Sequence, residues 1–222
     1  MEQERARKVR ILLVDDHPLI RGGLVELVNR QADMEVCAEA GTDSEALRAA
    51  ETCAPELAVV DLALGDADGL QLLRDLSSRF PRMRLLVLSM HEEELYAERA
   101  LRAGASGYVM KHERLHTVVE AMRCVLAGEV FLSPAMQSKL MQQLVRGKSG
   151  AGEPVASLTD RELQIFGMLG QGLGPSEIAK RLHLSVKTID AHRARIKDKL
   201  NVRTAAELRR RAIAWQRDGS LA

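Results

Sequence analysis

The stretch Leu57-Ala58-Val59-Val60-Asp61 decides the fold of this chain, because an apolar run ends there abruptly in a carboxylate. The run is rich in valine and lies between Pro55 and Gly65, which is typical of a buried strand in a parallel sheet. An ionised carboxylate at the end of such a strand needs a cation or hydrogen-bond donors close by. Asp61 therefore predicts a polar site whose other members come from elsewhere in the chain.

Further apolar runs are expected to form strands of the same sheet. They are Val9–Val14, residues 34–39, Arg84–Ser89 and residues 108–110. Helical spacing of apolar residues is found between and after these runs, after Pro18, after Thr42, and over Gly69–Arg79, residues 92–103 and residues 113–127. Strands that alternate with helices at this pitch predict an α/β fold with a doubly wound, five-stranded parallel sheet.

Polar residues follow the predicted strands directly, and they are expected to meet at one edge of the sheet. They are Asp15, Asp16, Asp61, Ser89 and Lys111. Three carboxylates, an ammonium and a hydroxyl suit a hard divalent cation and a phosphoryl group, because the cation offsets the repulsion between carboxylates. The competing interpretation, helix caps or solvated pairs, is common for any single residue of this kind and is disfavoured for five at successive strand ends.

Residues 8–128 resemble a response-regulator receiver domain of the NarL/FixJ type. The resemblance is carried by Asp15-Asp16, Asp61, Ser89 and Tyr108-x-x-Lys111. It extends to the surrounding text, Val14-Asp-Asp-His-Pro-Leu-Ile-Arg-Gly-Gly-Leu and Ala103-Gly-Ala-Ser-Gly-Tyr-Val-Met-Lys111. Such domains have a flavodoxin-like fold, which agrees with the sheet predicted from the strand pattern.

The resemblance implies that Asp61 accepts a phosphoryl group from a sensor histidine kinase. A carboxylate is a usable nucleophile once a metal ion neutralises the phosphoryl charge. Lys111 would contact the phosphoryl oxygens, and Ser89 and Tyr108 would form a switch pair. The implied ligands of the Mg²⁺ ion are the carboxylates of Asp15, Asp16 and Asp61 and the backbone carbonyl of Ala63.

The loop after the implied acceptor, Asp61-Leu-Ala-Leu-Gly-Asp-Ala-Asp-Gly69, departs from the family pattern. Family members commonly have proline where Gly65 stands, and Asp66 and Asp68 add negative charge. Glycine has more backbone freedom than proline, so we expect a looser loop. The lifetime of the phosphorylated state should differ as a result, in a direction that the sequence leaves open.

The charge is distributed unevenly along the 222 residues, although the net charge is only +1. Residues 147–222 carry 14 Lys and Arg against 8 Asp and Glu, and the rest of the chain is net negative. This asymmetry favours a regulatory or metal-binding module joined to one that meets polyanions. Residues 129–156 are expected to link them, with an extra helix at about 134–145 before a glycine-rich stretch.

The basic module, residues 157–217, is expected to be an all-α domain of four helices. Thr159 and Glu162 have the spacing of a capping box at the start of its first helix. Gly174-Pro175-Ser176 opens a second helix, and Ser185 caps a longer third one that runs to about residue 200. Two helices joined by a short turn, the second of them basic, predict a helix-turn-helix.

The basic helix has an apolar side and an opposite side suited to DNA. Ile189, Ile196 and Leu200 form its core stripe on a helical wheel. Ala191 and Ala194 lie on the opposite side and leave room for close approach to the floor of a groove. The basic residues expected to contact phosphates are Lys187, Arg193, Arg195, Lys197 and Lys199. A solvated charged face on a packing helix is the competing interpretation.

Residues 157–217 resemble a LuxR-type helix-turn-helix domain. The motifs that carry this resemblance are Leu158-Thr-Asp-Arg-Glu162, Gly172, Glu177-Ile-Ala179, Leu182, Ser185-Val-Lys-Thr188-Ile-Asp-Ala-His192, Ile196 and Lys199-Leu200. The resemblance implies binding to double-stranded DNA as a homodimer, with a last helix from Thr204 to about Arg217 as the dimer contact. Thr188 flanks the DNA-facing side of the basic helix.

The resemblance also assigns residues to the bases of the DNA. Base-edge contacts would fall to Asp190, Ala191 and Ala194, with Arg195 as a further contact. Some relatives have lysine at the position of Asp190, and an acid there would accept a hydrogen bond from a cytosine amino group. We interpret His192 as a phosphate or packing contact and not as a metal ligand.

Together these features predict a phosphorylation-controlled DNA-binding transcription regulator, a homodimer in its phosphorylated form, with no enzymatic activity beyond slow autodephosphorylation. An aspartyl-phosphate phosphohydrolase is one alternative, but such enzymes typically carry Asp-x-Asp on the first strand, where this chain has Asp15-Asp16. A phosphorylation-independent DNA-binding dimer is another, and the intact acceptor set disfavours it. No stretch resembles a signal peptide or approaches the roughly 20 apolar residues of a membrane span, so a cytoplasmic protein without a membrane partner is expected.

Overall fold

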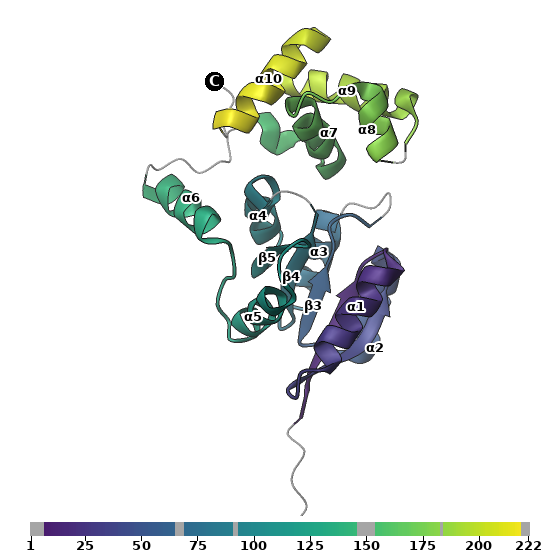
Figure 1. Cartoon of the computed structure of the whole chain (residues 1–222), viewed down its shortest axis with the longest axis vertical. Coiled ribbons are helices and arrows are strands. Elements are labelled where there is room, and N and C mark those ends of the chain that lie inside the picture. Colours follow the sequence, from purple (N-terminus) through teal and green to yellow (C-terminus); the bar gives the residue numbers. More distant parts are fainter. Residues whose placement is uncertain (1–6, 65–68, 91–92, 146–153, 183, 219–222) are drawn as a thin grey trace, which may run out of the picture. The chain divides into compact units, whose positions relative to one another are not determined.

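The computed structural model describes residues 7–64, 69–90, 93–145, 154–182 and 184–218 (Figure 1). The chain divides into two compact units, Met1–Gln142 and Gln143–Ala222. Three expectations lie outside the described residues: the acidic loop around Gly65, most of the glycine-rich stretch after residue 145, and the turn residue His183. None of the helices in the described part of the chain has the length and apolar character that a membrane span requires.

The first unit is built on a parallel sheet, which confirms the predicted α/β fold. Its strands are β1 (Val9–Val14), β2 (Met34–Ala40), β3 (Leu57–Val60), β4 (Arg84–Ser89) and β5 (Gly107–Met110). Their order across the sheet is β2-β1-β3-β4-β5, and all neighbouring strands are parallel. The direction of strand order reverses between β1 and β3, which places a ligand-binding crevice at the carboxyl ends of these two strands.

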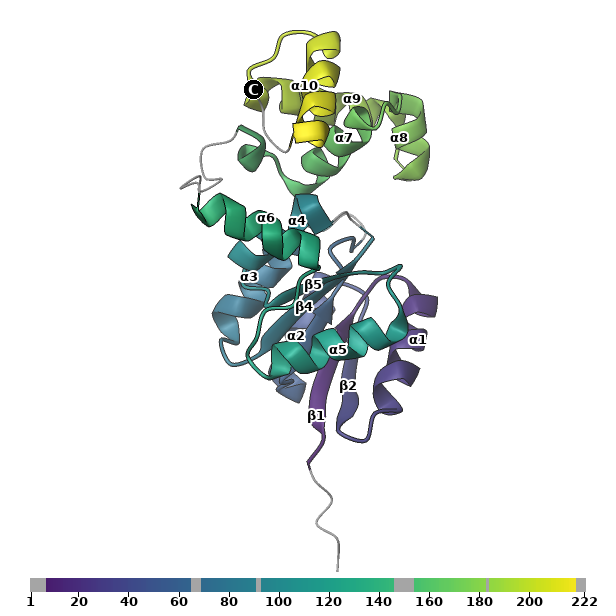
Figure 2. The same ribbon diagram turned by 60° about the vertical axis from the view of Figure 1, so that its left-hand side comes forward.

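Helices cover both faces of this sheet, and this explains why the strands are apolar along their whole length. The helices are α1 (Pro18–Asn29), α2 (Asp43–Cys53), α3 (Gly69–Arg79), α4 (Glu93–Arg102) and α5 (Leu115–Leu126). α1 and α5 lie on one face, and α2, α3 and α4 cover the other (Figure 2). Alternate strand residues such as Ile11, Leu13 and Val59 pack in one core with Val28 of α1 and Met122 of α5.

The segment after α5 returns to the edge of the sheet before a further helix, α6 (Pro134–Val145), begins. Phe131 forms a parallel bridge with Gly107 of β5. The amide of Ser133 then donates to Glu93 Oε1 of α4 across 2.8 Å. The start of α6 is therefore attached to the edge of the receiver sheet and to the first turn of α4.

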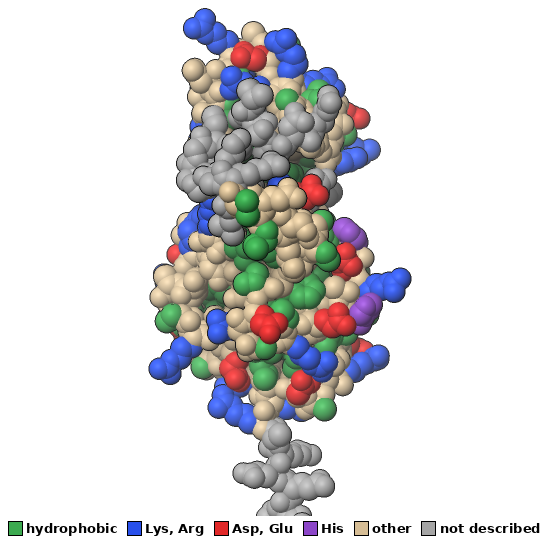
Figure 3. Space-filling view, turned by 90° about the vertical axis from the view of Figure 1, so that its left-hand side faces the viewer, with side chains coloured by type: hydrophobic (Ala, Val, Ile, Leu, Met, Phe, Trp, Pro, Cys, Tyr) green, Lys and Arg blue, Asp and Glu red, His purple; other side chains and the backbone are tan. Residues whose placement is uncertain are grey.

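Among the described side chains of α6, Met136 is buried in the first unit, whereas the apolar side chains of Met141 and Val145 are exposed to solvent. Met136 is 1% exposed, whereas Met141 and Val145 are 63% and 85% exposed. Figure 3 views the side of the receiver on which α6 lies in Figure 1, and hydrophobic side chains gather there among scattered charged ones. Met136, in the first half of α6, thus contributes to the core of the first unit.

The second unit is all-α, as predicted. After a short 3₁₀ turn at Pro154–Ser157 come α7 (Asp160–Gly170), α8 (Pro175–Arg181), α9 (Val186–Leu200) and α10 (Ala205–Asp218). The predicted capping box is present, because the amide of Thr159 donates to Glu162 Oε2 and the amide of Glu162 to Thr159 Oγ1. Phe166 of α7 and Trp215 of α10 pack together in the core, with ring centroids 5.5 Å apart and ring planes tilted by 48°. α8 and α9 form the helix-turn-helix.

Candidate functional site

The carboxylates predicted to meet at the edge of the sheet do come together. β1 and β3 are paired neighbours, so Asp15 and Asp16 after β1 lie beside Asp61 after β3. Asp15 and Asp61 are each 2% exposed. One donor atom from each of Asp15, Asp16, His17 and Asp61 lies within 4.8 Å of the others. The topology of the sheet thus builds a buried acidic pocket from residues far apart in the sequence.

Lys111 enters this pocket from the end of β5 and bridges two of its carboxylates. Its Nζ atom lies 2.6 Å from Asp61 Oδ2 and 2.7 Å from Asp15 Oδ2, and its side chain is 3% exposed. Burial raises the pKa of Asp61 above its usual range even though the Lys111 ammonium opposes that effect. Burial lowers the pKa of Lys111, but the carboxylates of Asp61 and Asp15 outweigh it, so this pKa lies above its usual range. One ammonium therefore serves two buried carboxylates.

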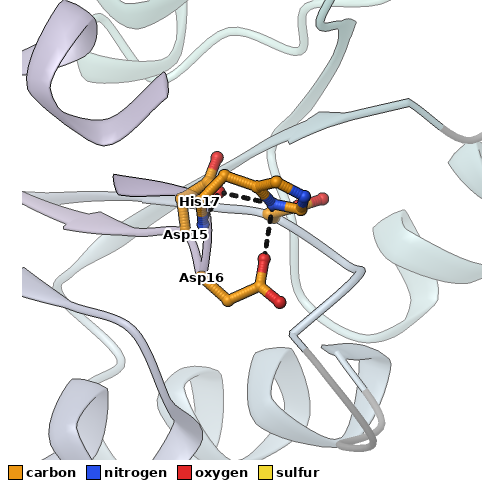
Figure 4. Close-up of side chains that lie close together, drawn as sticks. Asp15, Asp16 and His17 are labelled. Atoms are coloured by element: carbon orange, nitrogen blue, oxygen red, sulfur yellow. Dashed lines mark hydrogen bonds and ion pairs between the residues drawn. The ribbon is translucent and has the colours of Figure 1, made fainter. Parts of the chain in front are cut away.

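His17 is a member of the pocket that the sequence reasoning missed, although it stands directly after the acidic pair. Its Nδ1 atom lies 2.6 Å from Asp16 Oδ1 and 3.3 Å from Asp15 Oδ1 (Figure 4). Its backbone amide also donates to Asp15 Oδ1 across 2.8 Å. The ring is 60% exposed. His17 therefore lies at the solvent side of the acidic pair and orients both carboxylates.

The other predicted members of the pocket also lie near its carboxylates or on the neighbouring strands. The amide of Ala63 donates to Asp61 Oδ1 across 3.1 Å. Ser89 ends β4 and is fully buried, and Tyr108 of the adjacent strand β5 is 1% exposed. The amide of Lys111 donates to the carbonyl of Ser89 across 2.8 Å, which ties the ends of these two strands together. The Tyr108 ring is thus inside the receiver in this structure.

The residues of the pocket fit a hard divalent cation. Carboxylate oxygens from Asp15, Asp16 and Asp61 are the donors that Mg²⁺ prefers. Three carboxylates face one ammonium, so the pocket carries negative charge that a divalent cation would neutralise. The imidazole of His17 is the one nitrogen donor among the described residues of this cluster.

The basic helix α9 has the two sides that the wheel predicts. Its N-cap is Ser185, whose hydroxyl accepts from the amide of Thr188 across 3.0 Å. Ile189, Ile196 and Leu200 are buried against the rest of the domain. The exposed residues of its other side include Lys187, Asp190, Ala191, Ala194 and Arg195, whereas Thr188 and Lys197 are half-buried.

Two charged side chains of α9 are already paired within the domain. Arg193 Nη1 lies 2.7 Å from Asp190 Oδ1, so the acid expected to read a base is held by its neighbour. Lys199 Nζ lies 2.7 Å from Glu162 Oε2 and 3.1 Å from the carbonyl oxygen of Ser157. The structure therefore places the Lys199 ammonium against the start of α7, where it ties α9 to that helix.

His192 lies half-buried beside the core stripe of α9. Burial lowers its pKa below the usual range, and the nearby Arg195 guanidinium acts in the same direction. Its Nδ1 atom and Arg193 Nε are buried and have no hydrogen-bond partner among the described residues. These two polar atoms lie at the edge of the side that would face DNA.

Two family models match the chain. Residues 11–123 match the response regulator receiver domain, and residues 156–212 match the bacterial regulatory proteins of the luxR family. The chain belongs to the two-component response regulators that join a receiver domain to a LuxR-type DNA-binding domain. This confirms the resemblance of the sequence to response regulators of the NarL/FixJ type.

The relatives are regulators of the same length and layout. The chain is 37% identical to the DNA-binding transcriptional activator DevR/DosR of Mycobacterium tuberculosis, over 87% of this chain and 89% of that protein. It is 37% identical to the transcriptional activator protein ExaE of Pseudomonas putida, over 91% of this chain and 95% of that protein. It is 32% identical to the oxygen regulatory protein NreC of Staphylococcus carnosus, over 90% of this chain and 94% of that protein.

Solved structures show the same fold. A LuxR-family two-component response regulator from Aurantimonas sp. SI85-9A1 is 34% identical, with a TM-score of 0.58 over 63% of this chain and 99% of that one. RcsB from Salmonella enterica serovar Typhimurium, bound to promoter rprA, has a TM-score of 0.58 at 22% identity, over 92% and 98%. At 22% identity, the comparison with RcsB shows a similar fold and no more.

Proposed function

We propose that this response regulator accepts a phosphoryl group on Asp61 from a sensor histidine kinase, and that this event controls DNA binding by its C-terminal domain. The observation that carries the proposal is the buried Asp61 carboxylate, 2.6 Å from Lys111, with Asp15 and Asp16 beside it. The same chain carries a helix-turn-helix. The chemistry is that of a switch, with at most a slow autodephosphorylation.

The residues of the pocket have separate roles in the transfer. A carboxylate oxygen of Asp61 attacks the phosphorus, a P–O bond forms, and the P–N bond to the kinase histidine breaks as that nitrogen leaves with the bond electrons. Mg²⁺ held by Asp15, Asp16, Asp61 and the carbonyl of Ala63 would neutralise charge on the phosphoryl oxygens. Lys111, which now bridges Asp61 and Asp15, would turn to the new phosphoryl oxygens.

The switch pair would carry the signal away from the pocket. The Ser89 hydroxyl would bond a phosphoryl oxygen, and the change at the end of β4 would reach Tyr108 on the paired strand β5. Binding of this kind shifts a two-state equilibrium only by its difference in affinity for the two states. The face made by α4 and β5 is therefore the part of the receiver that we expect to differ between them.

On the DNA side, the exposure of Lys187, Asp190, Ala191, Ala194 and Arg195 supports the roles proposed for these residues of α9. Asp190, Ala191, Ala194 and Arg195 would meet base edges, and the phosphate contacts would come from Lys187, Thr188, His192, Arg193 and Lys197. Lys199 is assigned instead to the contact between α9 and α7, because its ammonium is already bonded to Glu162. We propose that the protein forms a phosphorylation-dependent homodimer through α10 and works in the cytoplasm. Its two domains would be residues 8–128 and residues 157–217.

The test is DNA affinity with and without phosphorylation. A binding site is first selected from random double-stranded DNA with the full chain, and its affinity is then titrated with and without acetyl phosphate and Mg²⁺. We expect a gain in affinity for wild type and for the control Asp33→Asn, whose carboxylate is exposed, and none for Asp61→Asn. A gain in Asp61→Asn, or no gain in wild type, would overturn the proposal. Repeated turnover of acetyl phosphate would favour the phosphohydrolase instead.

The contact roles on α9 have their own test. Lys197→Ala should weaken binding to every sequence and reduce its salt dependence, because a phosphate contact carries no sequence information. Asp190→Ala should change the preference at one base position. Equal effects of both variants on all sequences would contradict this division of roles.

A further inference from the structure

Arg21 of α1 reaches out of its helix to the backbone of the acidic pocket. Its Nη1 atom donates to the carbonyl oxygen of Asp15 across 2.6 Å. Its Nε atom donates to Glu39 Oε2, near the end of β2, across 3.0 Å. The Arg21 side chain is 21% exposed. One guanidinium thus connects α1, the end of β1 and the end of β2 directly beside the pocket.

Every polar atom of Asp15 has a partner. Its amide donates to the carbonyl of Ala40, and its Oδ1 atom accepts from the amide of His17. Its Oδ2 atom lies 2.7 Å from Lys111 Nζ. The carbonyl oxygen bonds Arg21. The other contacts, including the one from His17 Nδ1 to Asp15 Oδ1, are made by backbone groups or by side chains of the pocket. Among the described residues, Arg21 is therefore the side chain from outside the pocket that fixes Asp15.

We infer that Arg21 is a positioning residue for the divalent-cation site. It holds the peptide that joins Asp15 to Asp16, and the direction of that peptide decides whether both carboxylates point toward Asp61. Outer contacts that orient the ligands of a metal site change metal affinity by about 10- to 100-fold in other proteins. The inference rests on the proposed function, because it assigns Arg21 a part in the cation site of the phosphoacceptor pocket.

Glu39 explains how a cationic side chain can stand beside a cation site. A guanidinium without a counter-charge would repel a divalent cation, and its removal would strengthen binding. Glu39 offsets this charge and fixes the Nε side of the guanidinium, so that the other side is aimed at the Asp15 carbonyl. The sign of the change in Mg²⁺ affinity therefore separates a positioning role from a purely electrostatic one.

The experiment is a calorimetric titration of the full chain with MgCl₂. We expect Arg21→Ala to raise the Mg²⁺ dissociation constant by about tenfold. Arg21→Lys keeps the charge with one donor group, which reaches either Asp15 or Glu39, and should give a smaller increase. Glu39→Gln should weaken binding in the same direction. The matched control is Arg30→Ala, which should leave the constant unchanged. Arg30 is an exposed arginine at the C-cap of the same helix, and among the described residues its side chain pairs only with Glu26.

A second readout distinguishes positioning from a general loss of structure. In phosphorylation from acetyl phosphate, Arg21→Ala should raise the half-saturating Mg²⁺ concentration by the same factor while the rate at saturating Mg²⁺ stays close to that of wild type. Unchanged or tighter Mg²⁺ binding in Arg21→Ala overturns the inference. If that variant does not fold, Arg21→Lys and Glu39→Gln decide in the same way. If wild type itself binds no Mg²⁺, the proposed function fails, whereas equal binding by wild type and Arg21→Ala refutes the role of Arg21 alone.

Discussion

The two units of this protein each contain a lysine that bonds a buried carboxylate, and the two pairs behave in opposite ways. In the receiver, Lys111 Nζ lies 2.6 Å from Asp61 Oδ2. In the DNA-binding unit, Lys199 Nζ lies 2.7 Å from Glu162 Oε2. The distances are nearly equal, yet the pKa of Asp61 is raised and the pKa of Glu162 is lowered. Distance alone therefore does not set the direction of the pKa shift.

The surroundings of each carboxylate account for the difference. Burial raises the pKa at both sites and is the largest influence at both. At Glu162 it is outweighed by hydrogen bonds from Lys199 and Thr159, and no second acid in the described part of the chain shares the lysine. At Asp61 the ammonium is divided with Asp15, so burial prevails. A buried carboxylate that shares its ammonium with a second acid keeps a raised pKa, which is the behaviour that the proposed role of Asp61 requires.

The largest expected effect comes from removing the shared ammonium. Lys111→Ala leaves Asp15 and Asp61 buried together without a counter-charge, and breaking a buried pair in this way costs about 3–5 kcal/mol. We expect the free energy of unfolding of the receiver to fall by this amount. The measurement is urea denaturation followed by circular dichroism in the absence of divalent cations.

A second substitution controls this prediction. Because the loss arises from unpaired carboxylates, Asp61→Asn in the Lys111→Ala background should recover much of it. The effects of Lys111→Ala and Asp61→Asn on the free energy of unfolding should then be strongly non-additive. Additive losses in the double variant would mean that Lys111 stabilises the receiver by packing and not by charge.

A smaller effect is expected at the other pair. Glu162→Ala removes the capping box of α7 and the partner of Lys199, so we expect a loss of about 1–3 kcal/mol in the stability of the DNA-binding unit. Trp215 is the single tryptophan of the chain and is buried in this unit, so its fluorescence reports this unit alone. Lys197→Ala, a half-buried lysine two residues before Lys199, is the control and should change stability by less than about 0.5 kcal/mol.

The pH dependence of that loss has a definite sign. The pKa of Glu162 in the folded protein lies below its usual value of 4.5, so its charged form contributes stability above that value. This contribution disappears as the pH falls through the lowered pKa. The stability difference between wild type and Glu162→Gln, followed by Trp215 fluorescence, should therefore be constant near neutral pH and shrink below pH 4.5. A difference that grows in acid would mean that the carboxylate is not stabilised by its partners.

The smallest effect is expected where a similar pair is exposed. Arg102 Nη2 lies 2.6 Å from Glu98 Oε1 on α4, but the two side chains are 49% and 31% exposed. Exposed pairs of this spacing contribute about 0.3–0.5 kcal/mol. Glu98→Gln should accordingly shift the urea midpoint of the receiver only slightly, and high salt should abolish the shift. A loss as large as that of Glu162→Ala would show that burial is not what sets the energy of these pairs.

The sequence predicted the sheet and the pocket because hydrophobic runs mark the strands and each run stops at the residue that matters. It did not predict the contacts that depend on where a long side chain reaches. Lys199 was expected to contact phosphates, whereas packing of α9 on α7 lets its ammonium bond the Glu162 carboxylate 37 residues away in sequence. The bond from Arg21 to the pocket backbone and the position of His17 likewise depend on how α1 packs. The pair of Asp190 and Arg193, by contrast, has a spacing on α9 that helix geometry alone would have predicted.

The most direct test of the account is to locate a phosphoryl group on the chain. Intact-protein mass spectrometry after incubation with acetyl phosphate and Mg²⁺ should show one phosphoryl group on wild type and one on Lys199→Met, because that lysine belongs to the structural pair. Asp61→Asn should remain unmodified, and fragmentation of the wild-type adduct should place the group on Asp61. A phosphoryl group on Asp61→Asn, or none on wild type, would contradict the assignment of the receiver pair to phosphoryl transfer.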